Sequence, residues 1–129
     1  MDDISLEEAL FFEQKQSAFP LYVSLREQIF KRCGPADIQV KKTQISFFNR
    51  HLFAAVSFTP VRKAKERPES YITVTFGLSH RIDSSRIDVA VEVYPNRWTH
   101  HVMLGSECEI DAELLSWLKE AADFSNSKR

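Results

Sequence analysis

The chain has 129 residues, 43% of them hydrophobic and 12% aromatic, which is the composition of one folded domain with a single core. Its 17 basic and 18 acidic side chains give a net charge of −1, so overall charge draws it neither to nucleic acid nor to anionic lipid. No apolar run reaches the roughly 20 residues that span a bilayer. We therefore expect a single domain over residues 1–129 with no membrane partner, ending in a polar tail at 125–129.

Two features of the sequence favour the cytoplasm as its location. Four acidic residues lie within the first eight positions, where a secretory signal needs positive charge followed by an apolar run. Only two cysteines occur, Cys33 and Cys108, and they are far apart and outside any Cys-x-x-Cys pattern. Such spacing suits reduced thiols rather than a disulfide framework.

The first quarter of the chain has helical spacing. Ser5, followed three residues later by Glu8, is a capping-box pattern that predicts a helix over about 5–15. A second helix is predicted over about 19–33, because proline is well tolerated in a first helical turn and Gly34 is a usual helix stop. The positions that recur at three- to four-residue spacing in this second helix are Leu21, Leu25, Gln28, Ile29 and Arg32.

After the second helix, apolar residues alternate with polar ones, which indicates strands. The predicted strands cover residues 38–40, 44–47, 52–58, 71–78, 87–93 and 97–104. Because most connections between them are turns or short loops, we expect neighbouring strands to be antiparallel. The exception is the segment 59–70, which is bounded by prolines and strongly basic, and which we interpret as an exposed loop.

The same alternation predicts which side chains lie together. The side chains expected to share one face of their strand are Leu52, Ala54, Val56 and Phe58; Ile72, Val74, Phe76 and Leu78; and Trp98, His100, Val102 and Leu104. In the last of these strands Arg97, Thr99, His101 and Met103 are expected on the other face.

The chain closes with a helix that Asp111 caps. Its expected buried stripe is Leu114, Trp117, Leu118, Ala121 and Ala122. The predicted fold class is therefore α+β: one domain with a mainly antiparallel sheet of five or six strands. Two N-terminal helices and one C-terminal helix are expected to pack on one face of that sheet.

Polar groups suited to binding gather around the turn before the last strand. Arg97 can hold an anion, or it can pair with Glu92 across the turn. His100 shares the apolar face of its strand with Trp98, so we favour a hydrogen-bonded core histidine over a site histidine, although imidazole titrates near neutral pH. His101 points the opposite way and cannot join it.

The candidate ligand-binding residues are Lys42, Thr43, Glu92, Arg97, Trp98 and His100. In this hypothesis Arg97 and Lys42 hold an anionic or polar group, and His100 orients it by hydrogen bonding. If Glu92 and His100 instead form an acid–base pair, the domain is a small enzyme. We assign no catalytic residue.

Other chemistry has little support in the sequence. No His-x-His, His-x-x-x-His or Cys-x-x-Cys spacing predicts a metal site, and no Gly-x-Ser-x-Gly elbow predicts a nucleophile. The three glycines do not form a phosphate loop, and we predict no cofactor. The basic segment 62–67 leaves nucleic acid as a less favoured partner, because the interleaved aromatic residues of such modules are missing.

Four motifs together resemble one known family. They are Arg-Trp-Thr-His-His-Val at 97–102, Ile-Asp-Ala-Glu-Leu-Leu-Ser-Trp-Leu-Lys-Glu-Ala at 110–121, Lys-Thr-Gln-Ile-Ser-Phe at 42–47 and Phe-Ala-Ala-Val at 53–56. Their order within about 21–124 resembles the domain of unknown function 5655 family, which is found in bacteria and archaea.

The resemblance implies a role but little chemistry. Family members are stand-alone domains or are attached to other modules, nuclease-like ones included, which implies an accessory or binding role. No catalytic residue carries over, and the positions that match the family's motif are Lys42, Thr43, Arg97, Thr99 and His100. Ala121-Ala122 stands where relatives often have Ala-Tyr, so a site lined by that tyrosine is altered here.

We therefore expect a non-enzymatic module that binds a small polar or anionic ligand or a protein partner. It is expected to be a monomer, or a homodimer formed through an edge strand or exposed Phe residues. The alternatives are a small enzyme that uses His100 and a nucleic-acid-associated accessory domain that uses the loop 62–67.

Overall fold

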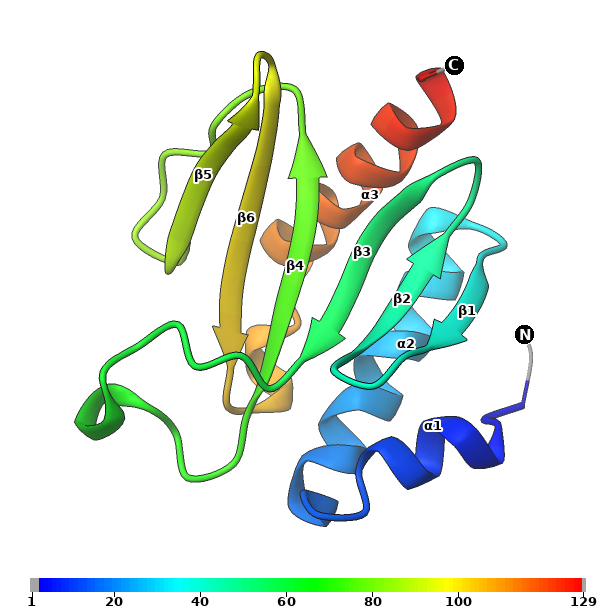
Figure 1. Cartoon of the computed structure of the whole chain (residues 1–129), viewed down its shortest axis with the longest axis vertical. Coiled ribbons are helices and arrows are strands. Elements are labelled where there is room, and N and C mark those ends of the chain that lie inside the picture. The colour runs from blue at the N-terminus through cyan, green and yellow to red at the C-terminus, as the bar shows by residue number, and fades with distance from the viewer. Residues whose placement is uncertain (1–2, 129) are drawn as a thin grey trace.

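A six-stranded antiparallel sheet with the strand order β1-β2-β3-β4-β6-β5 forms the centre of the structure. The structure is a computed structural model that describes residues 3–128 (Figure 1). The strands are β1 (Asp37–Val40), β2 (Gln44–Phe48), β3 (Leu52–Ser57), β4 (Ile72–Leu78), β5 (Val89–Tyr94) and β6 (Arg97–Leu104). The helices are α1 (Leu6–Phe11), α2 (Phe19–Cys33) and α3 (Ala112–Ser127).

The two longer helices, α2 and α3, lie behind the sheet in Figure 1, and α1 lies below them at one end. The opposite face of the sheet, which we call the open face, carries no helix (Figure 1). The predicted α+β class, the antiparallel sheet and the placement of two helices at the start and one at the end are confirmed. No helix within residues 3–128 is long and apolar enough to cross a bilayer.

The core lies between the sheet and the helices. Ile72, Val74, Phe76 and Leu78 of β4 are all buried there, as their alternation predicts. The predicted stripe of α3 is also buried, and its Trp117 stacks on Phe76 with ring centroids 6.1 Å apart. Asp111 caps α3 by accepting a hydrogen bond of 3.0 Å from the backbone N–H of Leu114.

The first helix ends earlier than predicted. It stops at Phe11 rather than near position 15, and a short 3-10 turn, Gln16–Ala18, follows before α2 begins. Phe12, the C-cap, is only 1% exposed and packs against Tyr22, with ring centroids 5.0 Å apart. The free energy gained by burying this ring is larger than that of the extra hydrogen bonds that a longer helix would form over the polar residues 13–17.

A β-bulge changes the alternation in β3. Phe47 pairs with Ala54 and Phe48 with Leu52, so Phe53 is an extra residue on β3. An extra residue allows two successive side chains to point to one face of a sheet. Phe53 is accordingly buried in the core, whereas Leu52 is 44% exposed. The prediction that Leu52 shares a face with Ala54 is therefore wrong, because periodicity alone does not reveal a bulge.

A buried ion pair joins α1 to α2. Glu8 and Arg26 are 2% and 3% exposed, and Arg26 Nε lies 2.7 Å from Glu8 Oε2. The Tyr22 hydroxyl and the Ser5 backbone N–H also donate to this carboxylate, the latter completing the predicted capping box. Burial acts to raise the pKa of Glu8, but the hydrogen bonds from Arg26, Ser5 and Tyr22 outweigh it, and the pKa is lowered.

We expect Glu8→Gln to lower the free energy of unfolding by about 3 kcal/mol at pH 7, because removing one partner of a buried ion pair is costly. Urea denaturation followed by circular dichroism measures the change. Glu7→Gln, one position away and exposed, is the matched control and should stay within about 0.5 kcal/mol of wild type. Equal stability of the two variants would contradict the assignment.

The pH dependence of this effect has a definite sign. A carboxylate whose folded pKa is lowered stabilises the protein fully above its unfolded pKa, and this contribution is lost as pH falls through the folded pKa. The stability difference between wild type and Glu8→Gln should therefore be largest above about pH 4.5, the ordinary pKa of Glu8, and shrink in stronger acid. Urea denaturation in buffers on both sides of that pH measures it.

Candidate functional site

The structure does not bring the six predicted site residues together. Lys42 and Thr43 directly precede Gln44 of β2. Through the strand pairing across the sheet, Gln44 is level with Met103 of β6. Arg97 is six positions from Met103 on that strand, which is about 20 Å at the rise of a strand. The predicted site is therefore divided between two ends of the sheet.

His100 is fully buried and fulfils the description of a core histidine. Its ring stacks on Phe76, with centroids 5.1 Å apart, and its Nε2 accepts a hydrogen bond of 3.0 Å from the backbone N–H of Ile82. Because Nε2 accepts, the proton of the neutral ring is on Nδ1. Burial lowers the pKa of His100, although the backbone of Phe76 acts in the opposite direction.

Glu92 does not act on His100 in this structure. Glu92 is level with Trp98 and His100 with Ala90, so the register puts the carboxylate and the imidazole on the same face of the sheet, not on opposite faces. Glu92 is exposed, however, and its Oε2 accepts a hydrogen bond of 3.2 Å from the backbone N–H of Asn96. Among residues 3–128 no hydrogen bond joins it to His100, nor an ion pair to Arg97.

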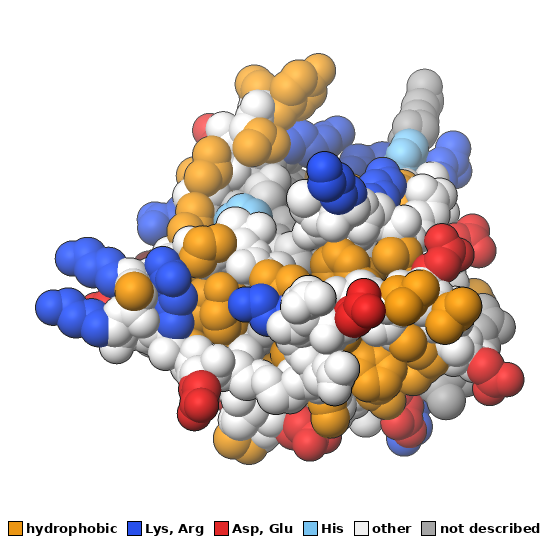
Figure 2. All heavy atoms as spheres, turned by 60° about the horizontal axis from the view of Figure 1, so that its bottom comes forward, with side chains coloured by type: hydrophobic (Ala, Val, Ile, Leu, Met, Phe, Trp, Pro, Cys, Tyr) orange, Lys and Arg blue, Asp and Glu red, His pale blue; other side chains and the backbone are white. Residues whose placement is uncertain are grey.

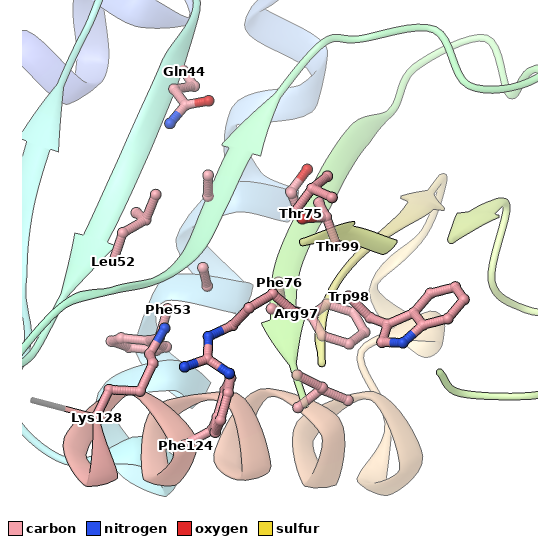
Figure 3. Close-up of a pocket in the computed structure, with 15 residues that line it drawn as sticks. Gln44, Leu52, Phe53, Thr75, Phe76, Arg97, Trp98, Thr99, Phe124 and Lys128 are labelled. Atoms are coloured by element: carbon pink, nitrogen blue, oxygen red, sulfur yellow. The ribbon is translucent and has the colours of Figure 1, made fainter. Parts of the chain in front are cut away.

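A groove of about 270 Å³ lies on the open face at the end of the sheet where Arg97 is located. Gly77 of β4 forms part of the floor of this groove, and Thr75 and Thr99 also line it (Figure 3). Leu52 and Gln44 line it from the side of β2 and β3 (Figure 3).

The last turn of α3 closes one end of this groove. Phe124 and Lys128 contribute to its lining, and the side chains of Arg97 and Lys128 converge on Phe124 (Figure 3). The Arg97 guanidinium lies 5.0 Å from the centre of the Phe124 ring, and Lys128 Nζ lies 4.8 Å from it. Two cations therefore share one aromatic ring.

No carboxylate of the described residues neutralises these two cations. The Arg97 side chain donates a hydrogen bond of 3.0 Å to the carbonyl oxygen of Asn96. Within residues 3–128, neither Arg97 nor Lys128 forms an ion pair. Burial lowers the pKa of Lys128, and the charge of Arg97 lowers it further. The end of the groove is thus a place where an added anion is favoured.

Hydrogen bonds hold the last turn of α3 in this position. The Asn49 side-chain amide donates to the carbonyl oxygen of Ala122 at 2.9 Å, and the His51 backbone N–H donates to Ser125 Oγ at 3.0 Å. The Ser125 hydroxyl also donates to the Asn49 side chain. The turn between β2 and β3 therefore places Phe124 and Lys128 next to Arg97, which is distant in sequence.

Sequence reasoning identified Arg97 and Trp98 of this groove but missed several of its residues. Phe124 was expected only as the end of the family-like segment, and Lys128 as part of a polar tail. Gly77 offered one signal, because glycine inside a strand often marks a close approach of another group. Nothing in the sequence indicated Lys128, whose position depends on the hydrogen bonds that Asn49 and His51 form with the last turn of α3.

The open face beside the groove is polar. Thr75 Oγ1 lies 2.8 Å from His101 Nδ1, and Gln44 donates a hydrogen bond of 2.8 Å to Ser46. His101 faces away from His100 as predicted, and burial lowers its pKa also.

The basic loop is attached to the sheet. Arg62 Nε lies 2.7 Å from Asp88 Oδ1, and Arg62 Nη2 donates to the carbonyl oxygen of Met103 at 3.1 Å. Arg67 donates to the Arg62 carbonyl oxygen. Lys63 and Lys65 are exposed, and basic side chains project at the left of Figure 2. Of the four basic residues in the segment 62–67, Arg62 and Arg67 thus hold the loop in place, and Lys63 and Lys65 remain exposed.

The edge strands differ in their exposure of apolar side chains. Val91, Val93 and Tyr94 of β5 are 47%, 63% and 68% exposed. Within residues 3–128 every Phe is buried or half-buried, so the exposed Phe residues expected at a dimer interface are not present.

Among residues 3–128, no group of three or more His, Cys, Asp or Glu could hold a metal ion.

These features define a small α+β domain with a polar open face and a groove that ends at two cations. The chain belongs to the family described as Domain of unknown function (DUF5655), whose model matches residues 7–125. The match includes most of α1 and so begins before the family-like core expected from about position 21. No curated protein and no solved structure matches the chain.

We expect His100 to make stability depend on pH. Its pKa is lowered in the folded protein, so below about pH 6.5 the unfolded chain binds a proton that the folded chain does not, and stability falls as pH decreases. His100→Gln removes this contribution, because an amide does not titrate in that range. Urea denaturation at pH 7.5 and 5.5 should show a smaller loss of stability for the variant. Parallel losses in the two proteins would contradict this account.

Proposed function

We propose that this domain is a non-enzymatic ligand-binding module whose ligand carries an anionic group. The observation that carries the proposal is the pair of cations, Arg97 and Lys128, on the single ring of Phe124 at the end of the groove. Two like charges at one place repel each other, and the pKa of Lys128 is lowered by burial and further by this repulsion from Arg97. A bound anion relieves it.

The chemistry of an anion site supports Arg97 as the principal contact. A guanidinium has donors in a planar fork that fits a carboxylate or a phosphate, whereas an ammonium acts as a point charge. Among the residues that the structure describes, one hydrogen bond uses this fork, from Arg97 to the neighbouring Asn96 carbonyl. Lys128 adds electrostatic attraction for the bound anion, and the face of the Phe124 ring keeps both cations in place.

Catalysis has weaker support than binding. A general acid or base must reach the proton that it transfers, and the acceptor nitrogen of His100 is already occupied by the Ile82 N–H. His100 is fully buried and lines no part of the groove. We therefore assign His100 to the core beneath the site rather than to the site itself.

We also propose that the module works in the cytoplasm. Cys33 and Cys108 are both free thiols, and this state suits a reducing compartment. Whether the module acts alone or as an accessory to a partner protein, the groove is the part that supplies a ligand site.

Arg97→Ala should weaken the binding of inorganic phosphate by about tenfold or more, the usual effect of losing a charge-assisted hydrogen bond. Lys128→Ala should weaken it by a smaller factor. Phosphate is titrated at constant ionic strength while the amide signals of β4 and β6 are followed by NMR. Lys42→Ala is the matched control, since this exposed lysine lies at the other end of the sheet.

The proposal fails if phosphate, sulfate and acetate all leave the signals of Arg97 and its neighbours unchanged. It also fails if Lys42→Ala weakens binding as much as Arg97→Ala does, because the response would then be a general effect of charge.

A further inference from the structure

Gly77 is the unusual residue of the groove. It lies near the end of β4, where it pairs with Thr99 of β6. Glycine inside a strand destabilises the strand, because it loses more backbone entropy on folding and contributes no side chain to packing. A glycine in this position therefore needs a reason, such as a positive φ angle, a steric clash or the close approach of another group.

The protein itself gives no reason for this glycine. Its φ angle is not positive, since the positive-φ residues within 3–128 are Gly34 and Asn96. A Cβ atom built on Gly77 meets only the carbonyl oxygen of Trp98, at 3.8 Å, which is ordinary van der Waals contact. Gly105 shows the contrast, because a Cβ there would lie 2.6 Å from Pro68. The space above Gly77 is thus open on the side of the groove.

The bulge in β3 enlarges this space. Ala54 pairs with Phe76, so Phe53 is the β3 residue next to Gly77. Phe53 belongs to the lining of the groove, but its side chain is buried in the core. Two adjacent positions on the open face therefore have no side chain above the backbone. The strands on either side of β4 are about 9.5 Å apart, which is wide enough for a single ring.

Two exposed apolar side chains line the groove on either side of this bare floor. Leu52 comes from the neighbouring strand β3, and Val93 comes from β5, which lies beyond β6; they are 44% and 63% exposed. Exposed apolar side chains lining one groove gain free energy when a ligand covers them. Peptide planes without a side chain above them offer a flat surface on which a planar ring can lie.

We propose that the groove takes a planar aromatic compound with a single anionic group, whose ring lies on the backbone of Gly77 between Leu52 of β3 and Thr99 of β6, with Val93 beyond Thr99. Its carboxylate or phosphate is held by Arg97 and Lys128. This inference rests on the proposed function for the anionic end and adds the class of the ligand's body. Thr99 borders the ring position and supplies a hydroxyl for a polar substituent.

Benzoate and cyclohexanecarboxylate test the proposal on the full chain. The two have the same charge and the same number of ring carbons, but only benzoate is flat. Benzoate should bind about fivefold more tightly, the range expected for a specific ring contact. Binding is measured by NMR titration, with inorganic phosphate as the probe for the anion site alone.

Gly77→Val provides the variant. The new side chain occupies the ring position, so benzoate binding should weaken by about tenfold, whereas phosphate binding should stay within about twofold of wild type. The melting temperature should be equal or higher, because valine suits a strand better than glycine. If Gly77→Val does not fold, Gly77→Ala replaces it with the same expectation and a smaller effect.

The two levels of the proposal fail differently. If phosphate binds but benzoate has no advantage over cyclohexanecarboxylate, the aromatic ligand class is wrong and the anion site stands. If Gly77→Val leaves benzoate binding unchanged, the ring does not lie on Gly77 and the inference is overturned. If no anion binds at Arg97, both the inference and the proposed function are wrong.

Discussion

The direction of the side chains along β6 is the constraint on which the rest of the structure depends. This strand is paired on both edges, with β4 and with β5, so no single side chain can turn to the other face without breaking two ladders. His100 is thereby committed to the core against Phe76, and Thr99 to the open face. The separation of the buried His100 from the groove on the open face follows from this alternation.

The groove exists because side chains are missing from the open face at adjacent positions. Gly77 has none, and the bulge removes that of Phe53 from the face. Both features weaken a regular sheet, and together they produce one hollow instead of two separate defects. The cations at its end come from elements that are distant in sequence, β6 and the last turn of α3.

The regions that stabilise the fold lie apart from this groove. Glu8 and Arg26 join α1 to α2, and Arg62 anchors the basic loop to Asp88. Neither pair lines the groove. The exception is the contact of Asn49 and Ser125, which holds the end of α3 against the turn between β2 and β3. A change there would alter both stability and the position of Lys128.

The sequence by itself determined the fold class, the antiparallel strands, the capped helices and the face on which His100 lies, because these depend on local periods and on caps within a few residues. The tertiary structure decided the rest. Lys42 and Arg97 carry similar charges on the same sheet, but only the strand register reveals that they lie at opposite ends. Lys128 joins the site through hydrogen bonds between segments more than 70 residues apart, and no local pattern encodes such a contact.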